Sequence, residues 1–351
     1  MPEQEIIELD VLPRLLPDAF AREDEGDDRE FYRDGRASPP LDALALQTTR
    51  ALIGDLVREP HPAILDLAAG ARTHLPDGLT PSRVVGVGLD EPALRDNPAL
   101  TEVLVHDLNA VPALPFAPAQ FDVVLSTFSL EYLTRPFDLF EQVGRVLKPG
   151  GLFLVVFSNR KVRRKAVQFW RDAPEHRRVR LVHELFLITG VFERLAQFEA
   201  VGRPRPADDA FAETGLPSDP IYAVWGDRAG ADPVRPPRPR PASIRGVPYD
   251  RDEVERRKRE VGQSLRCPYC DEPLTPWPVP QTPFTEWTCE EMFVCLSNRC
   301  PYYCGGWSEM DLQGNKGYSY RLMYNPDLDR CLPTPVAGLG ALRTGQALPR
   351  G

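Results

Sequence analysis

The chain has 351 residues, of which 26% are charged, and its formal net charge is −9. This length is enough for two domains with a sizeable core, and the negative charge makes a polyanion an unfavourable general partner, although local basic patches remain compatible with it. No apolar run approaches the roughly 20 residues that span a bilayer, and the acidic N-terminus lacks the apolar core of an export signal. We therefore expect a cytoplasmic protein that has no membrane partner.

Residues 1–40 are charged and show little periodicity, and residues 23–30 form an acidic run. The favoured interpretation of this first part is a charged lead-in exposed to solvent. Between residues 41 and 57 apolar residues recur at helical spacing, which predicts a helix before the first strand.

A series of short apolar runs rich in Val, Ile and Leu follows. They occupy residues 63–67, 84–87, 103–105, 123–125 and 152–157. Runs that are almost continuously apolar, instead of alternating, are typical of strands buried on both faces. A stripe with helical period at residues 137–147 separates the fourth run from the fifth and ends at Pro149-Gly150-Gly151. Strands that alternate with helices predict an α/β fold with a mostly parallel sheet covered on both faces.

Beyond this sheet the chain changes character. Residues 160–180 form a basic segment with interleaved apolar residues, which predicts helices with a basic face, and a solvated face is preferred to a site for an acidic partner. Residues 198–201 and 221–225 are the expected last strands, so the first domain should end near Gly226. Residues 227–262 combine the stretch PVRPPRPRP, which cannot pack as a helix or central strand, with a short charged helix.

Three segments carry a resemblance to a known family. DLAAG at residues 66–70, LPF…FD at 114–122 and RVLKPGG at 145–151 resemble the motifs of class I S-adenosylmethionine-dependent methyltransferases, over roughly residues 40–226. The resemblance implies a Rossmann-like doubly wound sheet, a methyltransferase domain over residues 41–226 and S-adenosylmethionine as cofactor. In such open sheets the ligand lies at the carboxyl ends of the strands, where the strand order reverses.

The same resemblance assigns roles to residues that follow the predicted strands. Asp66 would hold the methionine end of the cofactor, and a carboxylate there suits a ligand with an ammonium and a sulfonium. Asp107 would accept from the adenine amino group with the Leu108 backbone nearby, and Ser126 would lie close to the methionine moiety. The expected cofactor-binding residues are Asp66, Ala68, Gly70, Gly88, Asp90, Asp107, Leu108 and Ser126.

Two positions depart from the family pattern. Ala68 and Arg72 replace the outer glycines of the first turn, and Gly88 stands where an acid normally bridges the ribose hydroxyls. Either Asp90 or the residue after it reaches back to the ribose, or the ribose is held in another way. These departures motivate an alternative interpretation, a non-enzymatic scaffold with a degenerate methyltransferase fold.

Methyl transfer from a sulfonium needs mainly alignment and a water-poor site, and it needs a general base only when the acceptor must lose a proton. Glu131 and Tyr132, after the fourth strand, are the best-placed candidates to face an acceptor, with His74 and His106 as alternatives. For each of these residues, a role in packing or at a helix start fits the sequence as well as a role in facing the acceptor. No catalytic base is therefore assigned.

All seven cysteines fall in residues 263–351. Two close pairs, well separated along the chain, are the arrangement that a tetrahedral zinc site with four thiolates needs. The expected ligands are Cys267, Cys270, Cys295 and Cys300. Because four thiolates leave no open coordination position, the Zn²⁺ should be structural. Cys304 is the rival ligand, whereas Cys289 and Cys331 have no assigned role.

The segment FVCLSNRCPYY resembles Ogr/Delta-like zinc fingers and similar small bacterial zinc-ribbon proteins, which implies a zinc-ribbon domain. Zinc ribbons often bind nucleic acid, and the aromatic residues beyond this segment could stack on bases. Acidic residues match or outnumber basic ones here, which favours recognition of a substrate or a protein instead. We therefore expect a methyltransferase with an unknown acceptor, a small molecule or a protein; an RNA methyltransferase that grips nucleic acid with the ribbon is the second alternative.

Overall fold

The computed structural model describes residues 11–12, 17–33, 41–212, 216–230, 236–245, 250–279, 289–315, 317–337 and 341–342. The chain forms two compact units: Met1–Leu41, Leu46–Phe198 and Ile221–Ala242 make the first, and Asp42–Ala45, Glu199–Pro220 and Ser243–Gly351 make the second. The domain boundaries at residues 40, 226 and 262 remain predictions. Within the described ranges, no helix combines the length and the apolar character needed to cross a membrane.

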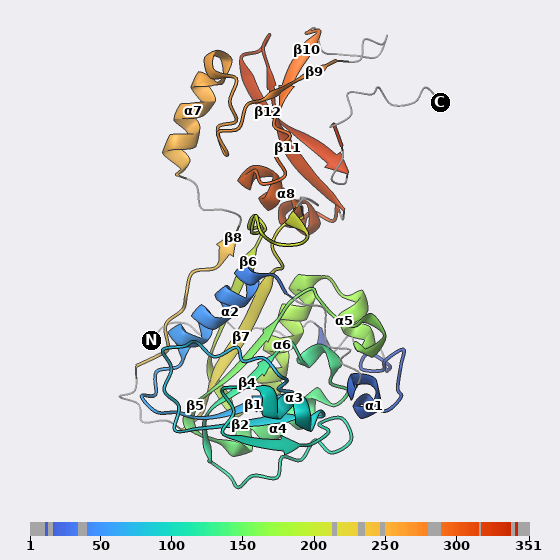
Figure 1. Cartoon of the computed structure of the whole chain (residues 1–351), viewed down its shortest axis with the longest axis vertical. Helices are drawn as coiled ribbons and strands as arrows, with labels where there is room; N and C mark the ends of the chain where they lie inside the picture. Colours follow the sequence, from blue (N-terminus) through green and yellow to red (C-terminus); the bar gives the residue numbers. More distant parts are fainter. Residues whose placement is uncertain are drawn as a thin grey trace. The chain divides into compact units, whose positions relative to one another are not determined.

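A mixed sheet with strand order β3-β2-β1-β4-β5-β7-β6 is the centre of the α/β part, and the short β8 extends it (Figure 1). Its strands are β1 (Ala63–Leu67), β2 (Arg83–Gly88), β3 (Glu102–Val105), β4 (Phe121–Thr127), β5 (Leu147–Phe157), β6 (Phe192–Val201), β7 (Ile221–Arg228) and β8 (Ile244–Arg245). The strands from β3 to β5 pair in parallel, and β7 runs antiparallel to β5. This order confirms the predicted Rossmann-like sheet. The order reverses between β1 and β4, where such folds bind their ligand.

Helices precede and connect the strands of this sheet. They are α1 (Asp28–Arg33), α2 (Ala43–Leu56), α3 (Glu91–Asp96), α4 (Pro136–Val146), α5 (Gln168–Asp172) and α6 (Glu175–Thr189), with single turns η2 (Leu130–Tyr132) and η3 (Arg163–Lys165). The ring of Phe140 in α4 lies 4.9 Å from that of Phe153 in β5 and 5.0 Å from that of Phe186 in α6. The predicted helices before the first strand and before the fifth strand are therefore confirmed, as α2 and α4.

The acidic run and the basic segment pair with each other. Asp24 lies 3.4 Å from Arg164, and Glu23 lies 3.3 Å from Arg171. Asp28 is only 6% exposed, and its carboxylate lies 2.9 Å from the buried Lys165 ammonium. The expectation that both charge runs are solvated is thus wrong for Asp28 and Lys165, which are buried. Glu23 and Arg164 stay exposed as expected, although each pairs with a residue of the other run.

Part of the proline-rich stretch packs on the first unit. Arg238 is 7% exposed, and it donates to the carboxylate of Asp227 at 2.6 Å and to the carbonyl of Leu56 at 2.7 Å. A buried guanidinium with an anionic partner holds this irregular segment in place without secondary structure.

The second unit contains a four-stranded antiparallel sheet with order β12-β11-β10-β9. Its elements are α7 (Arg251–Ser264), β9 (Thr275–Pro278), β10 (Glu291–Val294), α8 (Pro301–Leu312), β11 (Tyr318–Asn325) and β12 (Arg330–Ala337). The predicted charged helix is α7, and its N-cap residue is Asp250, whose carboxylate accepts from the backbone N–H of Asp252 at 2.9 Å. Cys267, Cys295 and Cys300 lie in its apolar core, so the interior forms around the cysteines.

Candidate active site and metal site

A cavity of about 450 Å³ lies at the carboxyl ends of β1, β2, β3 and β4. Each of these strands sends its following loop to the cavity wall, at residues 68–72, 88–90, 106–109 and 127–129. The structure thus brings six of the predicted cofactor-binding residues to one cavity: Ala68, Gly70, Gly88, Asp90, Asp107 and Leu108. Asp66 and Ser126 lie outside this wall.

Asp66 is the residue of β1 that comes two positions before the cavity loop. Its side chain is buried, and no hydrogen-bond partner of Oδ1 lies among the described residues. Burial raises the pKa of this carboxyl to about 7, because a buried carboxylate loses hydration without gaining a compensating charge. An ammonium group supplied by a ligand would provide that charge, so the site fits the methionine end of S-adenosylmethionine.

Ser126 contacts the cavity through another residue. Its hydroxyl lies 2.9 Å from the hydroxyl of Ser129, which lines the cavity. Asp107 lines the cavity directly, and its Oδ1 accepts from the backbone N–H groups of Asn109 at 2.9 Å and Ala110 at 3.1 Å. These two bonds fix the carboxylate at the start of the loop after β3.

The first turn keeps its shape although it lacks two glycines. Ala68 adopts φ 54°, the left-handed region that glycine populates most readily, and Arg72 is exposed at the rim. A Cβ at Gly88 would lie 2.5 Å from the carbonyl oxygen of Ala69. The missing acid at Gly88 therefore follows from the close approach of the first turn. Asp90 also lines the cavity, as the N-cap residue of α3.

Replacing Gly88 by alanine should displace the first turn, because the new methyl group meets backbone and not a flexible side chain. We expect a loss of about 1–3 kcal/mol in the free energy of unfolding and weaker S-adenosylhomocysteine binding, measured by urea denaturation and calorimetry. Gly70→Ala is the matched control, since a Cβ at Gly70 has no atom within 4 Å. Equal stability losses in the two variants would contradict this explanation of Gly88.

The two candidates from η2 lie differently. Glu131 is 0% exposed and lies outside the cavity wall, and burial raises the pKa of its carboxyl to about 7. Tyr132 lines the cavity, and its hydroxyl accepts from the backbone N–H of Val162 at 3.0 Å. Tyr132 is therefore the η2 residue that lines this cavity, and Glu131 is not.

Both candidate histidines lie in the cavity wall. His106 donates from Nε2 to the carbonyl of Val111 at 2.7 Å. The ring of His74 packs edge-on against Phe128 with centroids 5.2 Å apart. Burial, with smaller contributions from the charges of Arg50 and Arg72, lowers the pKa of His74 to about 4. At neutral pH His74 is therefore uncharged, and it offers a polar edge in a largely apolar wall.

The contribution of residues 17–33 to the cavity was not expected from the sequence. Asp28 and Tyr32 of α1 line it, as do Leu41 before α2 and Leu46 within α2. The signal available in the sequence was the complementary charge of residues 23–30 and 160–171, which indicates pairing once the two runs are considered together.

In the second unit the four predicted zinc ligands come together. The sulfur atoms of Cys267, Cys270, Cys295 and Cys300 all lie within 4.8 Å of one another. Cys267 Sγ is 3.8 Å from Cys300 Sγ, and Cys270 Sγ is 3.6 Å from Cys295 Sγ. Four sulfurs at about 2.3 Å from a tetrahedral zinc are about 3.8 Å apart. The cluster therefore fits Zn²⁺, and Cys304 is outside it because its thiol donates to the carbonyl of Asn298 at 3.3 Å.

A buried arginine organises one half of this cluster. Arg321 is 0% exposed and donates to the carbonyl groups of Cys295 at 3.2 Å and Ser297 at 3.3 Å, and to the side chain of Asn298 at 2.5 Å. Its guanidinium lies 4.0 Å from the ring centroid of Tyr303. A cation in this position also offsets the negative charge of four thiolates around one Zn²⁺. Arg321 lies far from the four cysteines in the sequence, so this contact could not be predicted from the sequence alone.

The strand order and the strand-end cavity define the class I methyltransferase fold. Residues 65–155 match the family model described as "Methyltransferase domain". The chain therefore contains a class I S-adenosylmethionine-dependent methyltransferase domain, as the resemblance implied, together with a four-cysteine cluster consistent with a zinc site. No curated protein matches the sequence.

Solved structures similar to the chain include three methyltransferase structures. A chain from the complex of the Haloferax volcanii Trm112 methyltransferase activator with a methyltransferase has 16% identity and a TM-score of 0.38, and the match covers 54% of this chain and 91% of that chain. A Mesorhizobium loti S-adenosylmethionine-dependent methyltransferase has 17% identity and a TM-score of 0.34, and the match covers 52% of this chain and 96% of that chain. A Thermotoga maritima S-adenosylmethionine-dependent methyltransferase has 16% identity and a TM-score of 0.39, and the match covers 53% of this chain and 89% of that chain.

Proposed function

We propose that this protein is an enzyme that transfers the methyl group of S-adenosylmethionine to an acceptor bound in the strand-end cavity. The observation that carries the proposal is the convergence of four successive strand-end loops on one cavity. The strand that leads into the first of these loops also carries Asp66, a buried carboxyl whose Oδ1 has no partner among the described residues. The cofactor supplies a methyl group that is already activated on a sulfonium. The protein then has to align the two reactants and exclude water.

The residues of the wall, together with Asp66 in the strand before it, suit this task. Asp66 would hold the ammonium of the cofactor, and Asp107 with the Leu108 backbone would receive the adenine. Phe128, Tyr132 and the uncharged His74 provide aromatic walls around the remaining space. The acceptor we favour is a small molecule, or a side chain of a protein that can enter the cavity.

The scaffold alternative loses its main motivation. Ala68 adopts a backbone conformation that glycine favours, and the Arg72 side chain is exposed. The absence of an acid at Gly88 is explained by the lack of space for a Cβ at this position. None of these features fills the site.

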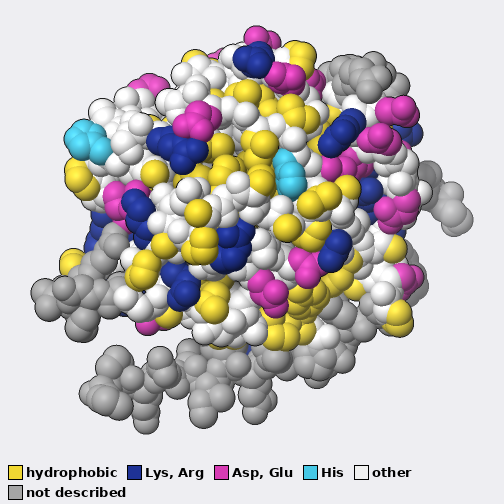
Figure 2. Space-filling model, turned by 90° about the horizontal axis from the view of Figure 1, so that it is seen from below, with side chains coloured by type: hydrophobic (Ala, Val, Ile, Leu, Met, Phe, Trp, Pro, Cys, Tyr) yellow, Lys and Arg dark blue, Asp and Glu magenta, His cyan; other side chains and the backbone are white. Residues whose placement is uncertain are grey.

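The RNA methyltransferase alternative needs free basic surface. The face in Figure 2 shows Lys and Arg interspersed with Asp and Glu instead of gathered in one basic patch, and several basic residues of segment 160–171 pair with residues 23–28. Nucleic-acid binding with a steep salt dependence would favour this alternative.

For the second unit we propose a structural Zn²⁺ bound by the four clustered thiolates, in a module that recognises the substrate or a protein. The sulfur geometry and the position of the cysteines in the core support this assignment.

Isothermal titration with S-adenosylhomocysteine tests the proposed function. We expect one binding site per chain and a rise in the melting temperature of the first unit, because a ligand that binds only the native state stabilises it. Absence of both heat and thermal shift at about millimolar ligand, which corresponds to a binding free energy weaker than about 4 kcal/mol, would refute it.

A further inference from the structure

Residues 17–33, called here the N-terminal segment, form one side of the cavity through Asp28 and Tyr32. The segment lies along residues 164–169, with which it exchanges backbone hydrogen bonds. Asp24 donates to the carbonyl of Arg164 at 2.9 Å, and Gln168 donates to the carbonyl of Ala21 at 2.8 Å. The N-terminal segment is thus part of the cavity wall, although it is far from the cofactor motifs in the sequence.

Buried charges hold the segment in this position. The Lys165 side chain is 1% exposed, and its ammonium lies 2.9 Å from Asp28 Oδ1 and 2.8 Å from the carbonyl of Gly26. Arg22 lies 2.6 Å from Asp28 Oδ2. If the segment moves away, the buried ammonium of Lys165 loses Asp28 and the carbonyl of Gly26 together, whereas Arg22 moves with Asp28 because both belong to the segment. Separating a buried ion pair leaves an uncompensated buried charge, which is costly. The segment therefore has one defined closed position, without intermediate positions.

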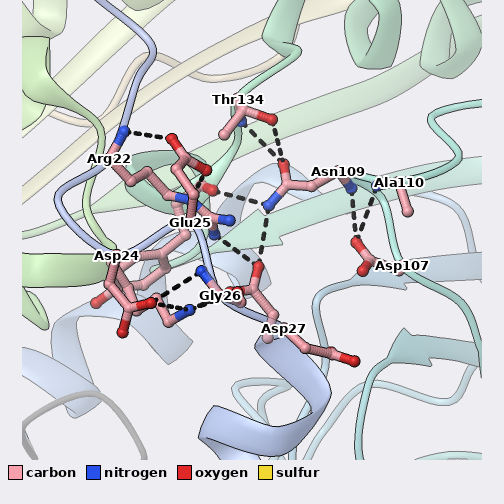
Figure 3. Close-up of polar contacts among 12 residues, drawn as sticks. Arg22, Asp24, Glu25, Gly26, Asp27, Asp107, Asn109, Ala110 and Thr134 are labelled. Carbon is pink, nitrogen blue, oxygen red and sulfur yellow. Dashed lines mark hydrogen bonds and ion pairs between the residues drawn. The ribbon is translucent and has the colours of Figure 1, made fainter.

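Asn109 connects this closed segment to the loop that carries Asp107 (Figure 3). Its amide nitrogen donates to Asp28 Oδ2 at 3.3 Å and to the carbonyl of Tyr132 at 3.1 Å. Its amide oxygen accepts from the backbone N–H and the hydroxyl of Thr134, at 2.9 and 3.2 Å. All four hydrogen-bonding positions of the amide are therefore used, while its own backbone N–H donates to Asp107 at 2.9 Å.

We propose that the N-terminal segment is the gate of the ligand cavity, and that Asn109 is the positioning residue that couples closure of the gate to occupation of the Asp107 loop. The inference rests on the proposed function, since the coupled ligand is the cofactor. A cofactor at the Asp107 loop stabilises the position of Asn109, and Asn109 stabilises Asp28 and with it the closed segment. Because coupling is reciprocal, the closed segment also slows release of the cofactor.

Hydrogen–deuterium exchange on the full chain, with and without S-adenosylhomocysteine, tests this gate. We expect the amides of residues 17–33 to exchange on the order of tenfold more slowly with ligand, within the usual range of coupling between two sites. Asn109→Ala should abolish this difference and should release radiolabelled S-adenosylhomocysteine about tenfold faster, since the coupling energy is lost from the bound state. Thr134→Val is the matched control, because it removes one bond to Asn109 and leaves the bond to Asp28.

The outcomes separate the gate from the proposed function. If the wild type binds S-adenosylhomocysteine and exchange in residues 17–33 stays unchanged, the gate is wrong and the proposed function stands. If the wild type does not bind the ligand, both are wrong. If Asn109→Ala keeps ligand-induced protection, Asn109 does not position the gate. The wild-type comparison decides on the gate even where Asn109→Ala fails to fold.

Discussion

Replacing Cys295 by serine is expected to release the metal and unfold the second unit, while the first unit keeps its fold. Cys295 is 1% exposed and contributes one of the four clustered sulfurs. Zinc coordination contributes on the order of 10 kcal/mol to the folding of small zinc domains, which is as large as the whole stability of a typical domain. Elemental analysis should find one zinc per wild-type chain and none in the variant. Exchange mass spectrometry should show loss of protection in the four-stranded sheet β9 to β12 and in α8, and unchanged protection in β1 to β5.

The control for this experiment is Cys304→Ala. Cys304 is buried close to the cluster, but its thiol donates to the carbonyl of Asn298 and lies outside the set of four sulfurs. This variant should retain its zinc. If Cys304→Ala loses zinc and Cys295→Ser retains it, the ligand set is misassigned; a wild-type protein free of zinc after purification without chelators would contradict the metal site itself.

Binding of S-adenosylhomocysteine is expected to tighten about tenfold between about pH 6 and about pH 8, because the affinity follows the ionised fraction of Asp66. Without ligand the pKa of this carboxyl is raised to about 7, so most molecules carry it neutral below that pH. The ammonium of the ligand attracts only the ionised form. Asp66→Asn should weaken binding about a hundredfold, as expected when one partner of a buried charge pair is removed, and should abolish the pH dependence.

The same carboxyl makes the ligand-free protein less stable as pH rises. Its folded pKa lies above the ordinary value of 3.8, so the unfolded chain loses its proton first. Its contribution to stability is therefore complete below about pH 4 and is lost as pH rises towards about 7, the opposite of a salt-bridged carboxylate. Asp66→Asn should remove this decrease in the free energy of unfolding between about pH 4 and about pH 7, measured by urea denaturation across that range.

Glu131→Gln is a matched control for the binding experiment. Glu131 is also a fully buried carboxyl with its pKa raised to about 7 by burial, but it lies in η2 after β4, whereas Asp66 lies in β1 just before the first cavity loop. Both groups titrate in the same range, so titration alone cannot distinguish them. If the tenfold pH effect on ligand binding disappears in Glu131→Gln and persists in Asp66→Asn, the assignment of Asp66 to the ammonium is wrong.

The sheet could be predicted from the sequence because a strand buried on both faces has only one type of sequence pattern. Ile64, Leu65 and Leu67 of β1 are all essentially inaccessible to solvent, and such continuous apolar runs leave few alternatives. The zinc cluster could be predicted for a similar reason, since the spacing of Cys267 and Cys270 already places two sulfurs in one turn.

The walls of the cavity could be predicted only in part. Local sequence does not indicate that the first turn lies 2.5 Å from a Cβ position at Gly88, because that distance depends on how β1 and β2 pair. Nor does it indicate that Glu131 is turned into the core while its neighbour Tyr132 faces the cavity. Contacts between distant segments, such as those of Asn109 with Asp28 and Thr134, depend on the tertiary structure alone.

A crystal structure of the protein with S-adenosylhomocysteine bound tests the central claim most directly. We expect the ligand in the strand-end cavity, with its ammonium at Asp66 and its adenine at the loop of Asp107 and Leu108. Arg72 should remain at the rim. A ligand bound elsewhere, or a cavity in which Asp66 and Asp107 contact different molecules, would contradict the claim.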